Sequence, residues 1–277
     1  MTLVLSVTDL QARIKSLESQ NKTLPDAGIR LVDLRSAEAY AAGHIPGAVH
    51  GNAALLNRSE PPVGGLMPEP DSVNRFLEQI GARLGDQIIA YDGGLETPAA
   101  RLIWVMDAYG YEACSWLDGG YRAWLAAQLE SSTTATTAED GTLQLSLIGD
   151  NAISVDHLME QLDDNEELRI LDVRSAGEFK GLDRRADHAG HVPGAEHALW
   201  TSMLDEHGRL LDDATLQAQL SELDVTEDSD VIVYCQTHQR SAVTYVVLKH
   251  LGYAQVRAID GAWSAWGNRI DTPKHLA

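Results

Sequence analysis

Apolar residues in this chain gather in short unbroken runs that alternate with stretches of helical spacing. Residues 88–91, Ile-Ile-Ala-Tyr, and residues 231–234, Val-Ile-Val-Tyr, are two such runs. A run of this kind is typical of a strand buried on both faces of a parallel sheet. Residues 241–251 place apolar side chains along one helical face, and Gly252 follows as a stop signal. The pattern predicts an α/β fold in which helices cover both faces of a mostly parallel sheet.

The same sequence blocks occur twice, in the same order and at offsets of 139, 147, 143 and 142 residues. The matched pairs are residues 31–37 and 170–176, residues 43–48 and 190–195, residues 88–91 and 231–234, and residues 117–124 and 259–266. Solenoid units of about 20–50 residues are too short to explain this period, so it indicates a duplicated domain.

The two copies are separated by a polar stretch at residues 130–141 that lacks helical spacing and is typical of a linker. We therefore expect a first domain at residues 1–126, a linker at residues 127–150 and a second domain at residues 151–277.

Charge and cysteine content exclude several classes of protein. The 277 residues include 21 Lys and Arg against 41 Asp and Glu, a net charge of −20, which disfavours nucleic acid and anionic membranes as partners. Two cysteines cannot form a disulfide framework, and no Cys and His set has the spacing of a zinc site. The first residues lack the features of a signal peptide, and no apolar run approaches a membrane span. We expect a cytoplasmic protein.

The sequence places Cys235 directly after the predicted strand at residues 231–234 and a few residues before the next helix. In such sheets ligands bind beyond the carboxyl ends of the strands. The N–H groups and the dipole at a helix start favour an anion, so we expect a nucleophilic thiolate here. Arg240 adds a permanent charge and a planar set of donors for an oxyanion. The other loop residues that we expect to bind substrate are Gln236, Thr237, His238, Gln239 and Ser241.

The first copy differs at the matching position. Asp92 follows the strand at residues 88–91 where the second copy has Cys235. A carboxylate cannot carry out thiolate chemistry and would repel an anionic substrate. We therefore expect the first copy to be catalytically inactive.

The repeated blocks, with one Cys loop in the second copy, resemble the two-domain rhodaneses, which are sulfurtransferases. The likeness covers nearly the whole chain apart from the linker and implies two tandem rhodanese-like domains. The loop itself, Cys-Gln-Thr-His-Gln-Arg-Ser at residues 235–241, resembles that of a bacterial thiosulfate:cyanide sulfurtransferase branch.

The resemblance implies a ping-pong reaction in which Cys235 takes the sulfane sulfur of thiosulfate as a persulfide. An acceptor such as cyanide, another thiol or a protein then takes this sulfur. The loop N–H groups suit the thiolate and the persulfide, and Arg240 suits the oxyanion of the donor. No metal or organic cofactor is implied, and we expect a monomer.

Some positions depart from the family pattern. The loop is neither the Cys-Arg-Lys-Gly-Val-Thr of animal thiosulfate enzymes nor the Cys-Gly-Ser/Thr-Gly-Val-Thr of mercaptopyruvate enzymes. Glu178 stands where both groups carry a substrate-binding Arg, so we expect it to repel the carboxylate of mercaptopyruvate. The second copy is eight residues longer between residues 179 and 190. We take Arg185, from this insertion, and Trp200 as candidate cleft residues.

Other activities remain open from the sequence. A 3-mercaptopyruvate sulfurtransferase and a persulfide carrier that serves a protein acceptor are the alternatives closest to the main hypothesis. A Cys-based phosphatase or arsenate reductase fits less well, because its loop places Arg six positions after Cys, whereas Arg240 lies five after Cys235.

Some side chains occur in both copies, including the copy that lacks the cysteine. We therefore expect these side chains to support the fold rather than catalysis. They are His44, His191, Asp33, Arg35, Asp172 and Arg174. We expect Cys114, in a strand-like run of the first copy, to be an inert buried thiol, and the loop at Cys235 to be accessible at the surface.

Overall fold

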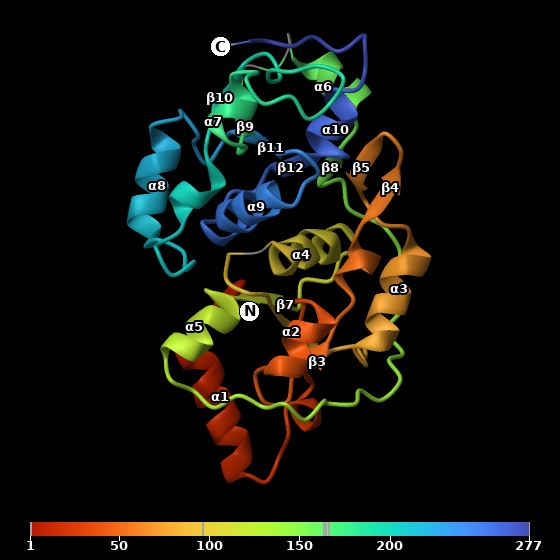
Figure 1. Ribbon diagram of the computed structural model, residues 1–277, viewed down its shortest axis with the longest axis vertical. Coiled ribbons are helices and arrows are strands. Elements are labelled where there is room, and N and C mark those ends of the chain that lie inside the picture. Colours follow the sequence, from red (N-terminus) through yellow and green to blue (C-terminus); the bar gives the residue numbers. More distant parts are fainter. Residues whose placement is uncertain (1, 96, 163–164, 166, 277) are drawn as a thin grey trace. The chain divides into compact units, whose positions relative to one another are not determined.

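The computed structural model describes residues 2–95, 97–162, 165 and 167–276 (Figure 1). The chain divides into two compact units. Unit 1 contains Met1–Leu56, Pro68–Ile148 and Asp205–Leu210, and unit 2 contains Asn57–Met67, Gly149–Leu204 and Leu211–Ala277. Each unit is built around a five-stranded sheet in which all neighbouring strands are parallel.

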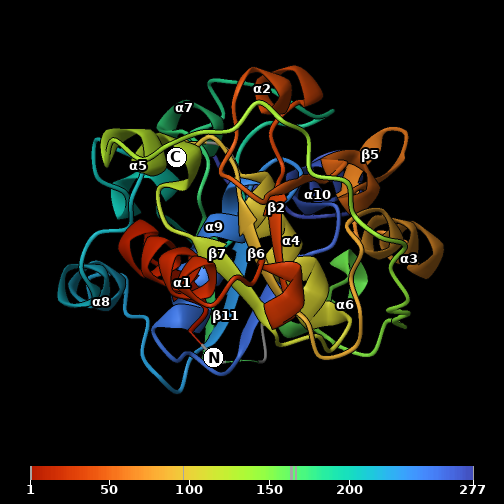
Figure 2. The ribbon, with the colours of Figure 1, turned by 90° about the horizontal axis from the view of Figure 1, so that it is seen from below.

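The sheet of unit 1 has the strand order β1-β7-β6-β2-β3, and Figure 2 shows β7, β6 and β2 next to one another. Its strands are β1 (Val4–Leu5), β2 (Ile29–Asp33), β3 (Val49–His50), β6 (Gln87–Tyr91) and β7 (Cys114–Leu117). The helices of the unit are α1 (Val7–Ser19), α2 (Ala37–Ala42), α3 (Pro70–Gln79), α4 (Pro98–Ala108) and α5 (Gly120–Ala126), with short 3₁₀ turns η1 (Pro25–Ala27) and η2 (Ala53–Leu56).

The sheet of unit 2 repeats this order as β8-β12-β11-β9-β10. Its strands are β8 (Ala152–Ile153), β9 (Leu168–Asp172), β10 (Ala195–His197), β11 (Asp230–Tyr234) and β12 (Val256–Ile259). The helices are α6 (Val155–Gln161), α7 (Ala176–Phe179), α8 (Asp213–Ser221), α9 (Arg240–His250) and α10 (Ala262–Trp266), with the 3₁₀ turn η3 (Trp200–Met203). The sequence repeat is therefore a repeat of structure, and the predicted α/β fold is confirmed.

The central strands are buried on both faces, as their composition predicts. Every residue of β11 is buried, and the core of unit 2 gathers around the fully buried Tyr234, Trp263 and Trp266. Helices lie on both faces of each sheet, with α4 and α1 on opposite faces in unit 1 and α9 and α6 on opposite faces in unit 2 (Figure 1).

The segment that the sequence analysis takes as a linker follows the surface of unit 1 over its first part. Ser132 pairs with His44 in a β-bridge, and the N–H of Thr136 donates to the hydroxyl of Tyr40 at 3.0 Å. The segment clusters with unit 1 as far as Ile148.

Each half of the sequence also contributes a short segment to the other unit. The antiparallel hairpin of β4 (Arg58–Glu60) and β5 (Val63–Leu66) belongs to unit 2, although it lies in the first half of the sequence. Residues 205–210, from the second half, belong to unit 1.

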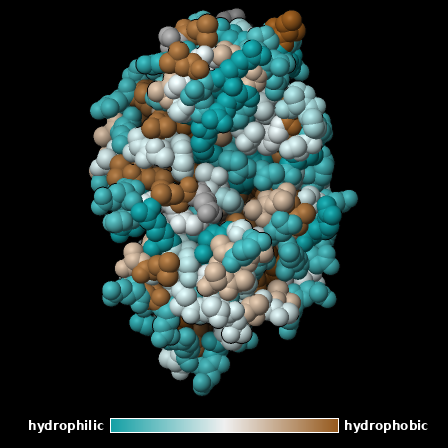
Figure 3. Space-filling view, in the orientation of Figure 1, coloured by the Kyte–Doolittle hydropathy of each residue, from teal (hydrophilic) through white to brown (hydrophobic). Residues whose placement is uncertain are grey.

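The face in Figure 3 carries mostly hydrophilic side chains, with smaller apolar areas between them. Leu182 and Ile270 are among the large apolar side chains that stay exposed. Of the helices in the described part of the chain, none is both long and apolar enough to cross a membrane.

Candidate active site

Cys235 is the first residue after β11, and α9 begins at Arg240. The first turn of α10 fixes the beginning of the intervening loop. The N–H of Trp263 donates to the carbonyl oxygen of Cys235 at 2.9 Å, and the N–H of Ser264 donates to that of Gln236 at 2.9 Å. The loop is therefore attached to the neighbouring βα connection as well as to its own strand and helix.

The backbone changes hand within the loop. His238 has a left-handed φ of +50°, and Gln239, the N-cap of α9, is right-handed with φ −97° and ψ −63°. Adjacent residues of opposite hand direct consecutive N–H groups toward one side, which forms a concave site for an anion. His238 and Ser241 are buried, and Nδ1 of His238 lies 2.7 Å from the Ser241 hydroxyl oxygen. This contact connects His238, the residue with left-handed φ, to the first turn of α9.

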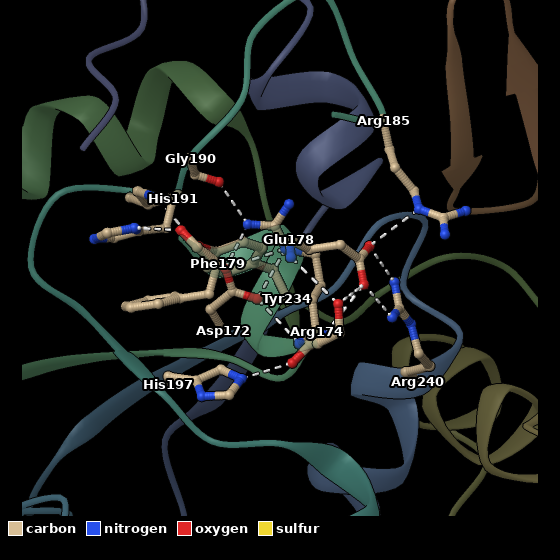
Figure 4. A network of polar contacts seen from close by, with 12 residues as sticks. Asp172, Arg174, Glu178, Phe179, Arg185, Gly190, His191, His197, Tyr234 and Arg240 are labelled. Atoms are coloured by element: carbon tan, nitrogen blue, oxygen red, sulfur yellow. Dashed lines mark hydrogen bonds and ion pairs between the residues drawn. The ribbon is translucent and has the colours of Figure 1, made fainter. Parts of the chain in front are cut away.

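Arg240 and Glu178 form a two-pronged ion pair (Figure 4). Nη1 and Nη2 of Arg240 donate to Oε2 and Oε1 of Glu178 at 2.7 and 2.9 Å. Glu178 also completes a capping box at the start of α7. Its N–H donates to the Ser175 hydroxyl at 3.2 Å, and its Oε2 accepts from the Ser175 N–H at 3.1 Å.

Both members of this pair are charged. Burial opposes the ionised form of Glu178, but Arg240 and then Ser175 outweigh it and lower the pKa of Glu178 to about 2. Burial likewise opposes the charge on Arg240, but the hydrogen bonds with Glu178 and the interaction with Cys235 raise the pKa of Arg240 above its ordinary value. The charge on Arg240 is thus favoured by the Glu178 carboxylate and by Cys235.

This pairing corrects the expectation for Glu178. The sequence treats Glu178 as an isolated negative charge that repels a carboxylate donor. In the structure its side chain is 3% exposed and its charge is matched by Arg240. Repulsion by Glu178 is therefore a poor basis for donor selectivity.

The structure places the remaining predicted loop residues as follows. Nε2 of Gln236 donates to the carbonyl oxygen of Arg185 at 3.0 Å, and Nε2 of Gln239 donates to Oδ1 of Asn57 at 2.5 Å. The backbone of Thr237 lies against the β4–β5 hairpin.

The two candidate cleft residues differ in their relation to the loop. Arg185 is beside it: its Nε lies 3.7 Å from Oε1 of Glu178, and its side chain is 63% exposed. Trp200 is half-buried in η3, where its N–H donates to the carbonyl oxygen of Val173 at 3.2 Å. The 3₁₀ turn η3 packs against α9 rather than belonging to the loop.

Cys235 itself is 1% exposed, whereas Gln236, Thr237, Gln239 and Arg240 are half-buried. The expected accessibility of the loop therefore does not extend to the thiol. Cys114 is buried, as predicted, and burial together with the nearby Asp107 raises the pKa of its thiol. Burial is common to both cysteines, so it does not distinguish them. What differs is the setting, because only Cys235 stands next to a guanidinium at a helix start.

In the matching loop of unit 1, the carboxylate of Asp92 accepts hydrogen bonds from nearby backbone N–H groups. Asp92 is fully buried, and its two oxygens accept from the N–H groups of Gly94 at 2.9 Å and Ala99 at 3.2 Å. A side chain on the loop itself therefore takes one N–H of the loop, that of Gly94, and one at the start of α4, that of Ala99. This arrangement suits the structural role predicted for the first copy.

The residues shared by both copies form a polar framework in each unit, and Figure 4 shows the framework of unit 2. In unit 2, Arg174 binds Asp172 through Nε and Nη2 and donates to the carbonyl oxygen of Gly190 at 2.7 Å. The Tyr234 hydroxyl donates to Asp172 at 2.7 Å, and the His191 ring stacks on Phe179. In unit 1, Arg35 binds Asp33 in the same way and the His44 ring stacks on Tyr40. The predicted framework roles are confirmed.

Sequence reasoning missed the partner of Arg240 and the contribution of the hairpin. The Ser-x-x-Glu pattern at residues 175–178 is a visible capping-box signal, and it could have shown that Glu178 is tied to a helix start. Nothing in the local sequence connects the hairpin to the loop. Among the described residues, no group of three or more His, Cys, Asp or Glu is placed to hold a metal ion.

Comparison with known proteins places the chain in a family. The model of the rhodanese-like domain matches twice, at residues 9–127 and 154–269. The chain belongs to the rhodanese family. It is 35% identical over 276 residues to a thiosulfate sulfurtransferase of Azotobacter vinelandii, covering 100% of this chain and 98% of that protein. It is 34% identical over 273 residues to a thiosulfate sulfurtransferase of Pseudomonas aeruginosa, covering 99% and 97%.

More distant rhodanese relatives include a protein with a different named donor. A 3-mercaptopyruvate sulfurtransferase of Escherichia coli is 29% identical over 263 residues, covering 90% of this chain and 93% of that protein. Among solved structures, an anaerobic ergothioneine biosynthesis enzyme from Chlorobium limicola has a TM-score of 0.83 at 20% identity, covering 99% of this chain and 70% of that chain. That likeness supports the fold.

Proposed function

We propose that this rhodanese is a thiosulfate sulfurtransferase in which Cys235 carries the transferred sulfur. The observation that carries the proposal is the position of Cys235, directly after β11 and five residues before Arg240, the first residue of α9. Two relatives that it matches at 34–35% identity over nearly their whole length are thiosulfate sulfurtransferases. The inactive first domain at residues 1–126, the linker and the catalytic domain at residues 151–277 are part of this proposal.

The reaction proceeds in two displacements that leave no net oxidation. The Cys235 thiolate attacks the outer sulfur of thiosulfate, the sulfur–sulfur bond of the donor breaks, and its electron pair leaves with sulfite. Cys235 then holds a persulfide. Cyanide attacks the outer sulfur of this persulfide, thiocyanate leaves, and the electron pair returns to Cys235 as a thiolate.

The loop supplies the electrostatic stabilisation that both steps need. The backbone N–H groups of the concave site at His238 and Gln239, and those at the start of α9, stabilise an anion at Cys235. Arg240 places a permanent positive charge beside the sulfur, and Glu178 fixes its orientation. Arg185 is a further cation next to the loop, and its exposure leaves it accessible to the oxyanion end of the donor.

Intact mass spectrometry tests the persulfide directly. Mixing the protein with thiosulfate should add one sulfur atom, and adding cyanide should remove it. Cys235→Ser should stay unchanged in mass under the same conditions, whereas Cys114→Ser should gain and lose the sulfur as wild type does. Loading of the Cys235→Ser variant would overturn the proposal.

Steady-state assays separate this function from its alternatives. Continued turnover with cyanide indicates a transferase, whereas a persulfide carrier that serves only a docked protein would load once and stop. We expect thiosulfate to exceed mercaptopyruvate by about tenfold in kcat/KM, about 1.4 kcal/mol of transition-state binding. The compact donor can reach both Cys235 and the loop cations at once. An equal or better rate with mercaptopyruvate would assign the chain to that donor instead.

The cellular setting is also part of the proposal. The low cysteine content, two in 277 residues, fits the reducing cytoplasm. The net charge of −20 fits a monomer. We expect small molecules or a protein thiol as sulfur acceptors. Sedimentation of the purified chain tests the monomer, and cell fractionation tests the location.

A further inference from the structure

The two exchanged segments share two kinds of contact with the units they join. We call residues 57–67 the first arm and residues 205–210 the second arm. Figure 1 shows the β4–β5 hairpin of the first arm beside α10 of unit 2. The second arm lies in unit 1.

Each arm is anchored by an aspartate of the repeated Asp-Gly motif, which follows the strand in both copies. Oδ1 of Asp260 accepts from the N–H of Met67 at 2.8 Å in unit 2. Oδ1 of Asp118 accepts from the N–H of Leu210 at 2.8 Å in unit 1. In each unit the aspartate of this motif therefore holds an arm in place and takes no part in the proposed sulfur chemistry.

Each arm also packs a glycine against the loop that joins the central strand to the next helix, β11 to α9 in unit 2 and β6 to α4 in unit 1. A methyl group on Gly65 would lie 2.0 Å from the carbonyl oxygen of Thr237, and one on Gly208 would lie 1.9 Å from that of Gly94. Thr237 and Gly94 are each two residues beyond the start of their loop, which is Cys235 in unit 2. Both arm glycines have left-handed φ, +73° and +79°. The same close approach therefore occurs at a loop with cysteine and at a loop without it.

Further contacts connect the first arm to the catalytic loop. The Ser264 hydroxyl accepts from the N–H of Gly64 at 3.0 Å and donates to its carbonyl oxygen at 2.8 Å. The N–H of the same Ser264 donates to the carbonyl oxygen of Gln236. At the other end of the arm, Asn57 accepts from Gln239. The arm is thus attached near both ends of the loop.

We propose that the first arm is a positioning element of the active site and that Gly65 is its key positioning residue. The close fit of Gly65 against Thr237 sets the path of the loop and thereby the place of the Cys235 sulfur relative to Arg240. The first half of the chain therefore contributes to sulfur transfer through this arm. The inference rests on the proposed role of Cys235.

The size of the expected effect follows from the geometry. An ordinary contact for a methyl carbon begins at 3.4 Å, so alanine at residue 65 forces the arm and the loop apart by more than 1 Å. A displacement of this size in a catalytic group reduces the rate by up to about 100-fold. The loss of a left-handed glycine adds a cost in stability that both arms share.

A pair of matched variants tests the proposal in the full chain. Gly65→Ala and Gly208→Ala introduce the same clash at the same left-handed φ, one beside Cys235 and one beside the cysteine-free loop. For each variant we would measure thermal stability, the rate of persulfide formation from thiosulfate by intact mass, and the pH profile of Cys235 alkylation by iodoacetamide. Alkylation needs no sulfur transfer, so its result stands even if the proposed function fails.

We expect both variants to lose similar stability, but only Gly65→Ala to shift the alkylation profile and to slow persulfide formation by about 100-fold. Gly208→Ala should stay within about twofold of wild type in both. Equal effects of the two variants on Cys235, or an unshifted alkylation profile in Gly65→Ala, would overturn the proposal.

If either glycine variant fails to fold, the anchors provide a milder pair. Asp260→Ala and Asp118→Ala each remove one acceptor for an arm N–H. Asp260→Ala should slow persulfide formation and shift the Cys235 alkylation profile, and Asp118→Ala should do neither. Matching behaviour of the two aspartate variants would refute a specific role for the first arm.

Discussion

Arg240 and Glu178 bind each other through both terminal nitrogens of the guanidinium and both oxygens of the carboxylate. Glu178 is 3% exposed, while the Arg240 side chain is 27% exposed and interacts with Cys235. Removal of either partner leaves a charge in a partly buried place without its counterion, which is costlier than the loss of a surface ion pair. The pair therefore connects the stability of unit 2 to the chemistry proposed for Cys235.

The first prediction concerns the pH dependence of this pair. The pKa of Glu178 falls from 4.5 to about 2 in the folded chain. A lowered folded pKa contributes stability that is complete above pH 4.5 and is lost as the pH falls toward 2. This contribution is on the order of 3 kcal/mol. Urea unfolding of wild type and Glu178→Gln across this pH range should show a gap that closes on acidification.

Glutamine is the appropriate substitution because it can still complete the capping box with Ser175, so the comparison isolates the charge. A stability gap that stays constant between pH 7 and the acid limit would show that the ion pair is not its source.

The second prediction concerns Arg240 in catalysis. Arg240→Ala removes a charge-assisted contact beside the sulfur, and we expect kcat/KM for thiosulfate to fall by about 10- to 100-fold. Arg240→Lys should recover part of this loss, because it keeps the charge but not the two-pronged geometry. Steady-state kinetics with cyanide as acceptor provide the measurement, and wild-type kinetics in Arg240→Ala would leave the backbone N–H groups as the anion binder.

Unfolding of the same variants checks the structural part of that argument. Arg240→Ala leaves the Glu178 carboxylate buried without its partner, so the double variant Glu178→Gln/Arg240→Ala should be more stable than Arg240→Ala alone. Additive losses would contradict this coupling.

The structure also changes the expected result of Glu178→Arg. Based on the sequence, this substitution should improve the use of mercaptopyruvate by supplying a second cation. In the structure the new arginine would face Arg240 and remove the side-chain half of the capping box at the start of α7, the contact with the Ser175 N–H. We therefore expect a lower rate with both donors, measured in the same assay. Improved use of mercaptopyruvate would support the interpretation from sequence alone.

The repeat and the βα periodicity were sufficient to predict both sheets, and the Cys235 loop followed from the position of one residue after a buried strand. These features depend on local patterns. The contact between Gly65 and Thr237 has no local signature, because 172 residues separate the two in the sequence and nothing in either segment identifies the other. The same holds for the pair of Glu178 and Arg240, which lie on different helices.

The third prediction concerns the two cysteines. Cys235→Ser should abolish transfer, because serine cannot form a persulfide, while the near-isosteric change should leave stability almost unaltered. Cys114→Ser should keep most activity, since burial raises the pKa of the Cys114 thiol and leaves it protonated. Thiocyanate formation and thermal unfolding measure the two effects, and the opposite pattern of activity would mean that the site has been assigned to the wrong cysteine.

The fourth prediction concerns the cysteine-free loop of unit 1. Asp92→Ala removes the acceptor for the N–H of Gly94 in the loop and for that of Ala99 at the start of α4, and we expect a loss of about 1 kcal/mol in stability. Sulfur transfer at Cys235 should be unaffected. Chemical unfolding and the thiocyanate assay would show this separation.

A gain-of-function variant provides the complementary test. Asp92→Cys in a Cys235→Ser background should not restore transfer, because Thr97 occupies the place that corresponds to Arg240. Restored thiocyanate formation would show that a cysteine at a strand end is sufficient without the guanidinium.

The exchange of arms sets an order of assembly during synthesis. Ribosomes add about 5–20 residues per second, so the second arm leaves the ribosome several seconds after Ile148, where the main part of unit 1 ends. The first arm is made early, but its partner α10 lies at Ala262–Trp266, close to the end of the chain. We expect the nascent chain to carry an unfilled anchor at Asp118 and an undocked hairpin until translation is nearly complete. On a ribosome stalled between the two arms, unit 1 would be folded but would lack the second arm at Asp118.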